Sequence, residues 1–234
     1  MVEFNPEWYE KFIQSTDEKK VIISKISDIL KNKPCESCLE IGLGTYPFFA
    51  EILSKNFEKY VVVEKQKQDF RLPERVELIN NDWESVDLEE KFDVIIASHV
   101  FYYFKNKKRA VEKMFSHLNE DGRIIFVVNG KTADYGPIKL AFAKMINKKY
   151  LFTYDEVYEL IKNHKIREYT SPTEVNFDSF EDLFETLKLI FDNHEEEYKN
   201  NKEKLIDYFK RNLKAGKFVV DMKILEVTKA HNDR

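Results

Sequence analysis

Short apolar runs alternate with stretches of helical spacing along the first half of the chain. Runs rich in Val and Ile are typical of strands buried on both faces of a parallel sheet. They cover residues 38–42, 60–64, 76–79, 92–98 and 123–129. Apolar positions at helical spacing fill the intervening segments 47–55 and 107–118. Strands that alternate with helices predict an α/β fold with a doubly wound, mostly parallel sheet.

Two local features are predicted from single residues of this core. Pro47 suits the first turn of the first core helix, with Thr45 or Tyr46 as the residue that caps it. Asp121-Gly122 is typical of a turn, and we expect it to lead into the fifth strand.

Helical patterns lie on both sides of this core. Apolar positions over residues 7–32 recur at helical spacing and stop near Lys33-Pro34, which predicts an N-terminal cap of one or two helices. Beyond Gly130, further helices are expected over 131–150, 152–163, 178–189 and 194–212. Strand patterns at 165–170 and 217–228 predict two closing strands. A helical insertion therefore precedes the last strand.

Composition and charge exclude some classes of partner. The 234 residues are 43% hydrophobic, which is enough for a hydrophobic core that needs no disulfide or metal ion to stabilise it. The chain carries a net charge of −4. That small negative charge gives no general attraction to nucleic acid or to an anionic membrane. The chain shows neither the apolar core of a signal peptide nor an apolar run of 18 residues. We therefore expect a cytoplasmic protein.

The two cysteines form a Cys-x-x-Cys pair, Cys35 and Cys38, at the start of the first core strand. Such a pair can serve redox chemistry or bind zinc, but zinc needs four ligands and no second pair lies nearby. We expect a reduced pair and no metal site.

The glycine turn after the first strand carries the main functional signal. Gly42 and Gly44 follow the apolar run as Gly-x-Gly, where a backbone without Cβ atoms lets a ligand approach closely. Glu64 ends the second strand, 22 residues after Gly42. This is close to the roughly 20 residues expected before the acid that binds a ribose. The spacing predicts a nucleoside cofactor.

Three details favour S-adenosylmethionine over a dinucleotide. Glu40 precedes the turn, where a carboxylate would repel a pyrophosphate and attract the ammonium of a methionine moiety. Pro47 stands where a dinucleotide turn has its third glycine. At the end of the third strand, Asp82 is placed to accept from an adenine amino group while Trp83 stacks on the ring.

Taken in order, the segments LEIGLG, VVVEKQ, NNDW, FDVIIASHVFYYF and LNEDGRIIFVV resemble the class I S-adenosylmethionine-dependent methyltransferases over residues 38–128. The resemblance implies a seven-stranded Rossmann-like sheet that closes with an antiparallel pair. We expect a single domain that comprises a helical cap (1–32), a cofactor-binding core (33–130), a lid and helical insertion (131–216) and a closing strand (217–230). The family's third turn glycine is replaced by Tyr46, which either reaches over the methionine end or blocks it.

Within that superfamily, the segment from Ser98 to Gly130 and the tail from Gly216 are similar to the histamine N-methyltransferases. His99 matches a glutamine that contacts the acceptor in that family, and Glu18 matches an acid that holds the acceptor's amine. Ser98 is expected to face the cofactor, and Tyr103, like Tyr102, is expected to line the cofactor's sulfonium or the acceptor.

The resemblance implies in-line methyl transfer to a small molecule, most readily to an amine nitrogen. Oxygen as the methylated atom is the alternative. The family's amide contact from the last strand is not matched, because Val220 and Asp221 stand there, which argues against histamine itself. A non-catalytic protein that keeps the fold is a second alternative. A nucleic-acid methyltransferase is disfavoured by the charge and by the lack of a motif for flipped bases.

Overall fold

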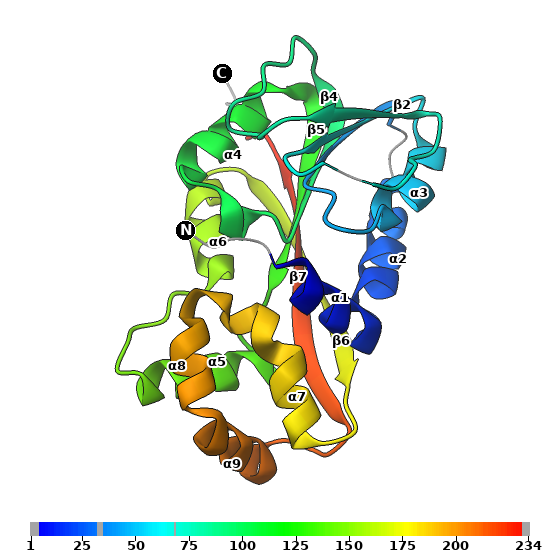
Figure 1. Ribbon diagram of the computed structural model, residues 1–234. Helices are drawn as coiled ribbons and strands as arrows, with labels where there is room; N and C mark the ends of the chain where they lie inside the picture. The colour runs from blue at the N-terminus through cyan, green and yellow to red at the C-terminus, as the bar shows by residue number, and fades with distance from the viewer. Residues whose placement is uncertain (1–4, 32–34, 68, 231–234) are drawn as a thin grey trace.

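A seven-stranded sheet forms the centre of the computed structural model, which describes residues 5–31, 35–67 and 69–230 (Figure 1). Its strand order is β3-β2-β1-β4-β5-β7-β6. The strands are β1 (Ser37–Ile41), β2 (Lys59–Glu64), β3 (Val76–Asn80), β4 (Phe92–Ser98), β5 (Leu118–Asn129), β6 (Lys165–Asn176) and β7 (Lys217–Thr228). Strands β1 to β5 pair in parallel, whereas β7 is antiparallel to both β5 and β6. The predicted fold class and the antiparallel closing pair are confirmed.

Helices cover the sheet and form the predicted insertion. The helices are α1 (Pro6–Ser15), α2 (Glu18–Lys31), α3 (Phe48–Leu53), α4 (Lys107–Ser116), α5 (Tyr135–Met145), α6 (Thr153–Ile161), α7 (Phe180–Thr186), α8 (Glu195–Asn200) and α9 (Lys202–Asn212). Short 3₁₀ helices are η1 (Ser54–Asn56), η2 (Phe101–Tyr103) and η3 (Leu187–His194). Figure 1 shows α5, α7, α8 and α9 gathered beside the far half of β7. No helix within residues 5–31, 35–67 and 69–230 has the length and apolar character needed to cross a bilayer.

Alternation along the central strands produces two hydrophobic cores, one on each face of the sheet. On β1, Cys38 belongs to one core and its neighbour Leu39 to the other. Val62 and Val63 of β2 divide in the same way. Successive side chains of a strand point to opposite faces, so a continuous apolar run fills both cores.

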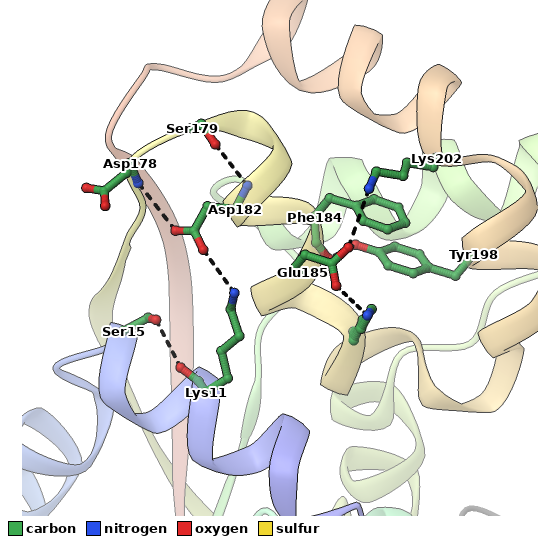
Figure 2. A network of polar contacts seen from close by, with 10 residues as sticks. Lys11, Ser15, Asp178, Ser179, Asp182, Phe184, Glu185, Tyr198 and Lys202 are labelled. Carbon is green, nitrogen blue, oxygen red and sulfur yellow. Dashed lines mark hydrogen bonds and ion pairs between the residues drawn. The ribbon is translucent and has the colours of Figure 1, made fainter.

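The N-terminal helix α1 is tied to the insertion by an ion pair. Lys11 Nζ lies 2.9 Å from Asp182 Oδ1, and Ser179 Oγ accepts from the backbone N–H of Asp182 at the start of α7 (Figure 2). Behind this contact, the rings of Phe184 and Tyr198 stack with centroids 4.3 Å apart. The N-terminal cap and the insertion therefore contact each other directly.

Some predicted boundaries were wrong. Pro47 takes the N-cap position of α3, not its first turn, and no side chain caps that helix. Asp121 and Gly122 lie inside β5, where the register with β4 shifts, not before it. The predicted helix over 194–212 is two helices that meet at Asn201. β6 also runs six residues further than predicted, because β7 offers a partner along its whole length.

Candidate functional site

The glycine turn after β1 is held by Glu64. Gly42 and Gly44 have φ angles of 80° and 72°, a conformation that glycine adopts without strain. Glu64 is 8% exposed, and its Oε2 accepts from the N–H groups of Leu43 at 2.7 Å and Gly44 at 3.2 Å. Its Oε1 accepts from Gln66 N at 2.7 Å. A carboxylate offers about four acceptor positions, so Glu64 can hold the turn and still accept from a ribose hydroxyl.

Glu40 lies buried beside this turn. Its side chain is 2% exposed and accepts a 2.7 Å hydrogen bond from the Tyr60 hydroxyl. Burial raises the pKa of Glu40 to about 7, although the Tyr60 hydrogen bond and the charge of Lys19 act in the opposite direction. Lys19, on α2, therefore places a positive charge near Glu40. Glu40 is the carboxyl group that we expected to attract the ammonium of the methionine moiety.

The structure contradicts the stacking role predicted for Trp83. The indole is 3% exposed in the core beneath α4, and its Nε1 donates to the Ala110 carbonyl at 3.2 Å. The Trp83 side chain is held by core packing and by this hydrogen bond, so its ring is not available to stack on a ligand. Asp82 remains at the end of β3, where its Oδ1 accepts from Glu84 N at 3.0 Å and its Oδ2 lies 3.1 Å from Lys65 Nζ.

Helix α1 covers the glycine turn. A Cβ atom built on Gly44 would lie 3.4 Å from the Tyr9 hydroxyl, so the Tyr9 ring packs directly over this glycine. The Tyr46 side chain does not turn back into the glycine turn, where it would block the methionine end of the cofactor. Its hydroxyl donates to Glu10 Oε1 at 3.2 Å, on the outer side of α1. Tyr46 therefore ties the turn to the N-terminal cap.

Two buried hydroxyls at the strand ends fit a polar ligand. Among the residues described, Thr45 Oγ1 in the turn and Ser98 Oγ at the end of β4 have no hydrogen-bond partner. Buried polar atoms are usually satisfied, so an unsatisfied pair beside a glycine turn indicates a ligand that supplies donors and acceptors. The residues present fit S-adenosylmethionine.

His99 and Glu18, which the sequence analysis named separately as candidate acceptor residues, lie next to each other beside this place. Glu18 is 4% exposed, and its Oε1 lies 3.5 Å from His99 Nε2. His99 has a φ of 51°, a sparsely populated conformation that tends to occur at functional sites. Its Nδ1 lies 3.4 Å from the Tyr102 hydroxyl, whereas its buried Nε2 has no hydrogen-bond partner within the described ranges. Burial lowers the pKa of His99 despite the nearby carboxylate of Glu18.

A cavity of about 230 Å³ opens next to this pair. It runs between the carboxyl end of β4, the N-terminal helices and the insertion. Predicted residues Glu18, His99 and Tyr103 line it. Residues that the sequence analysis did not single out also line it, including Lys19, Lys107, Lys139, Tyr135, Tyr150 and Phe191. Lys139 could not be found from the sequence, because a lysine within a predicted helix carries no signal that it is buried.

The cysteine pair belongs to the structure of the first strand. Cys35 and Cys38 are thiols, and Arg123 Nη2 donates to Cys35 Sγ at 3.2 Å. In the part of the chain that the structure describes, no group of three His, Cys, Asp or Glu residues is arranged to hold a metal ion.

A family model described as a methyltransferase domain matches residues 13–171. The chain belongs to the methyltransferase domain family. A malonyl-[acyl-carrier protein] O-methyltransferase of Bacillus cereus is 31% identical over 128 residues, which are 48% of this chain and 46% of that protein. The corresponding protein of Calditerrivibrio nitroreducens is 26% identical over 117 residues, 49% of this chain and 47% of its own length. The chain thus spans about half the length of the curated relatives it matches.

Solved methyltransferases share the fold. A putative methyltransferase of Bacillus halodurans aligns with a TM-score of 0.61 at 14% identity, over 88% of this chain and 97% of that one. The plantazolicin methyltransferase BpumL, solved with S-adenosylhomocysteine, aligns with a TM-score of 0.53 at 13% identity over 96% and 90%. The chain therefore carries a methyltransferase domain with the fold of these solved enzymes.

Proposed function

We propose that this chain transfers a methyl group from S-adenosylmethionine to a small molecule bound in the 230 Å³ cavity, and that the methylated atom is an amine nitrogen. The observation that carries the proposal is the pair formed by Glu18 and His99. We assign His99 the neutral tautomer that carries its proton on Nδ1, beside the Tyr102 hydroxyl, so that Nε2 is an acceptor 3.5 Å from Glu18 Oε1; the other tautomer would donate from Nε2 to Glu18 instead. An amine nitrogen that lies to the side of this pair, at hydrogen-bond distance from both atoms, could donate one N–H to each of them.

The cofactor would lie along the carboxyl ends of β1, β2, β3 and β4. Glu64 would accept hydrogen bonds from the ribose hydroxyls, and Asp82 would accept from the adenine amino group. The side chains of Glu40, Thr45 and Ser98 would bind the methionine part of the cofactor. The cofactor supplies an electrophilic methyl group. The protein's part is to orient the acceptor in line with that methyl group and to exclude water.

An amine must lose its proton to attack. Glu18 attracts the ammonium form, and His99, whose lowered pKa keeps the imidazole neutral near pH 7, accepts a proton from it. Tyr102 and Tyr103 also line the cavity. The similarity to the histamine N-methyltransferases supports nitrogen, although the match to their final-strand amide is missing.

Methylation of a carboxylate oxygen is the second candidate. It is supported by the curated relatives, whose names state O-methyl transfer to a malonyl group on acyl-carrier protein. A carboxylate placed beside Glu18 would be repelled by that carboxylate, which Lys19 Nζ only approaches to 3.8 Å. The geometry therefore favours nitrogen.

We further infer that residues 131–216 act as a lid over one domain that spans the chain. The contacts of α1 with the glycine turn and with α7 support this arrangement, because they join the cap, the cofactor side and the insertion. A small-molecule acceptor fits a cavity enclosed in this way, and neither nucleic acid nor a membrane is needed as a partner.

A methyl-transfer screen tests the proposed function. The protein is incubated with methyl-labelled S-adenosylmethionine and with amines, phenols, carboxylic acids and malonyl-acyl-carrier protein, and the products are identified by mass spectrometry. Labelled N-methyl products support the proposal. Methyl esters as the sole products would replace it with the second candidate. Cofactor binding without any transfer would favour a non-catalytic protein of the same fold.

A further inference from the structure

Lys19 places an ammonium group beside the glycine turn of the cofactor site. The residue lies in the first turn of α2, and its side chain is 14% exposed. Its Nζ lies 5.2 Å from the ring centroid of Phe49, in the first turn of α3, and 5.7 Å from that of Tyr9. The Tyr9 ring packs over Gly44. The ammonium therefore lies among side chains from the helix that covers the glycine turn and from the helix that follows it.

Acidic and phenolic neighbours keep this ammonium charged. Glu18 Oε1 lies 3.8 Å from Lys19 Nζ, which is an ion-pair distance but is longer than a hydrogen bond. Burial acts to lower the pKa of Lys19, but the Tyr9 phenol and the carboxylates of Glu18 and Glu40 raise it above its ordinary value. The desolvation of such a charge is costly, and an ion pair without a hydrogen bond offsets only part of that cost. The position of Lys19 beside a ligand site therefore calls for a function.

The charges of the cofactor's methionine part match this arrangement. That part carries an ammonium, a sulfonium and a carboxylate. The buried carboxyl group of Glu40 suits the ammonium, but Glu18 and Glu40 would both repel the carboxylate. The carboxylate therefore needs a cation next to the glycine turn, and Lys19 supplies one.

Other lysines near the site contact groups elsewhere. They are Lys65, which lies against Asp82 at the end of β3, Lys107, which lies against Glu156 in the acceptor cavity, and Lys139, which donates to the carbonyl of Ile190 in η3. Of these four lysines, Lys19 is the one that lies against the Tyr9 and Phe49 rings, next to the glycine turn.

We propose that Lys19 binds the carboxylate of the cofactor's methionine part from the side of the glycine turn, so that its ammonium lies between this carboxylate and Glu18. The inference rests on the proposed function, because it needs S-adenosylmethionine in the site. A cation between two carboxylates offsets their repulsion, and its bond to the cofactor is charge-assisted in surroundings of low dielectric constant. Thr45 Oγ1, buried in the turn without a partner among the described residues, offers a second donor. Lys19 thus distinguishes ligands that have this carboxylate from ligands that lack it.

Two ligands that differ only in this carboxylate test the inference. They are S-adenosylhomocysteine and its decarboxylated analogue, which keeps the adenosine, the sulfur and the amine. Calorimetry measures the affinity of the purified protein for each ligand, with no acceptor and no turnover. We expect the wild-type protein to bind S-adenosylhomocysteine at least about tenfold more tightly, since a hydrogen bond between charged groups contributes at least this much.

Three variants locate the preference. Lys19→Met removes the charge and keeps an unbranched side chain, and we expect it to bind the two ligands with affinities within about threefold of each other. Lys19→Arg keeps the charge and should retain the preference. Lys20→Met, at the exposed next residue of α2, is the matched control and should also retain it. Circular dichroism checks that each variant is folded.

Two results would overturn the inference and leave the proposed function standing. One is equal affinity of the wild-type protein for the two ligands. The other is a preference that survives in the folded Lys19→Met protein, including an equal loss of affinity for both ligands. Binding of neither ligand to the folded wild-type protein would overturn the proposed function as well.

Discussion

Glu18 Oε1 lies 3.5 Å from His99 Nε2, although the two residues come from the second helix of the N-terminal cap and from the end of the fourth strand. Burial costs both the carboxylate and the imidazole their hydration, and the further contacts of the pair are with Lys19 Nζ, 3.8 Å from Glu18 Oε1, and with the Tyr102 hydroxyl, 3.4 Å from His99 Nδ1. The pair is the acceptor side of the proposed site, and it gives the first prediction.

Glu18→Gln and His99→Ala should each lower the rate of methyl transfer by about 100-fold or more, a typical loss when a proton acceptor is removed. In the Glu18→Gln variant, the new side-chain amide can itself donate a hydrogen bond to His99 Nε2. That nitrogen then no longer accepts from the amine of the substrate. S-adenosylhomocysteine affinity, measured by calorimetry, should stay within about threefold. Glu7→Gln on the exposed side of α1 is the matched control. A parallel loss of cofactor affinity would mean that the pair is structural.

Glu64→Ala should weaken both the cofactor site and the fold. The change removes the acceptor of three backbone N–H groups and that of a ribose hydroxyl. Hydrogen bonds to a charged group contribute about 1.5–3 kcal/mol each, so a loss of cofactor affinity of at least about tenfold is expected. Calorimetry and urea unfolding measure the two effects. Unchanged affinity in a folded Glu64→Ala protein would refute the ribose assignment.

Trp83→Phe separates a core role from a cofactor role. The variant leaves a small void and removes the donor to the Ala110 carbonyl, which should cost about 1–3 kcal/mol of unfolding free energy. Cofactor affinity should not change, because the indole does not reach the site. A loss of affinity without a loss of stability would restore the stacking role that the sequence suggested.

The raised pKa of Glu40 predicts a dependence of stability on pH. The pKa is about 7 in the folded protein, against an ordinary value of 4.5, so between these values the folded state holds more protons than the unfolded state. The free energy of unfolding should therefore fall as the pH rises from about 4.5 to about 7, and this contribution should be constant above. Urea unfolding across this range should show a shallower fall in Glu40→Gln. An identical slope in both proteins would mean that Glu40 does not titrate there.

Much of this architecture could be predicted because buried parallel strands leave a strong pattern. The glycine turn and the acid at the end of the second strand could be predicted from residue types at strand ends. Similarity to a family singled out Glu18 and His99 separately, and the contact between them is seen only in the structure. Trp83 was misplaced because an indole beside a strand end packs equally well into the core or over a ligand, and tertiary packing decides between them. Lys139 left no local signal, since its burial depends on η3, which follows about fifty residues later in the chain.

The most direct test of the account is a calorimetric titration of the purified protein with S-adenosylmethionine and S-adenosylhomocysteine. The glycine turn, the Glu64 carboxylate and the unsatisfied hydroxyls of Thr45 and Ser98 predict one site with micromolar affinity, about −8 kcal/mol. We expect both compounds to bind, with at least tenfold weaker binding to Glu64→Ala. No binding of either compound to the folded protein would contradict it.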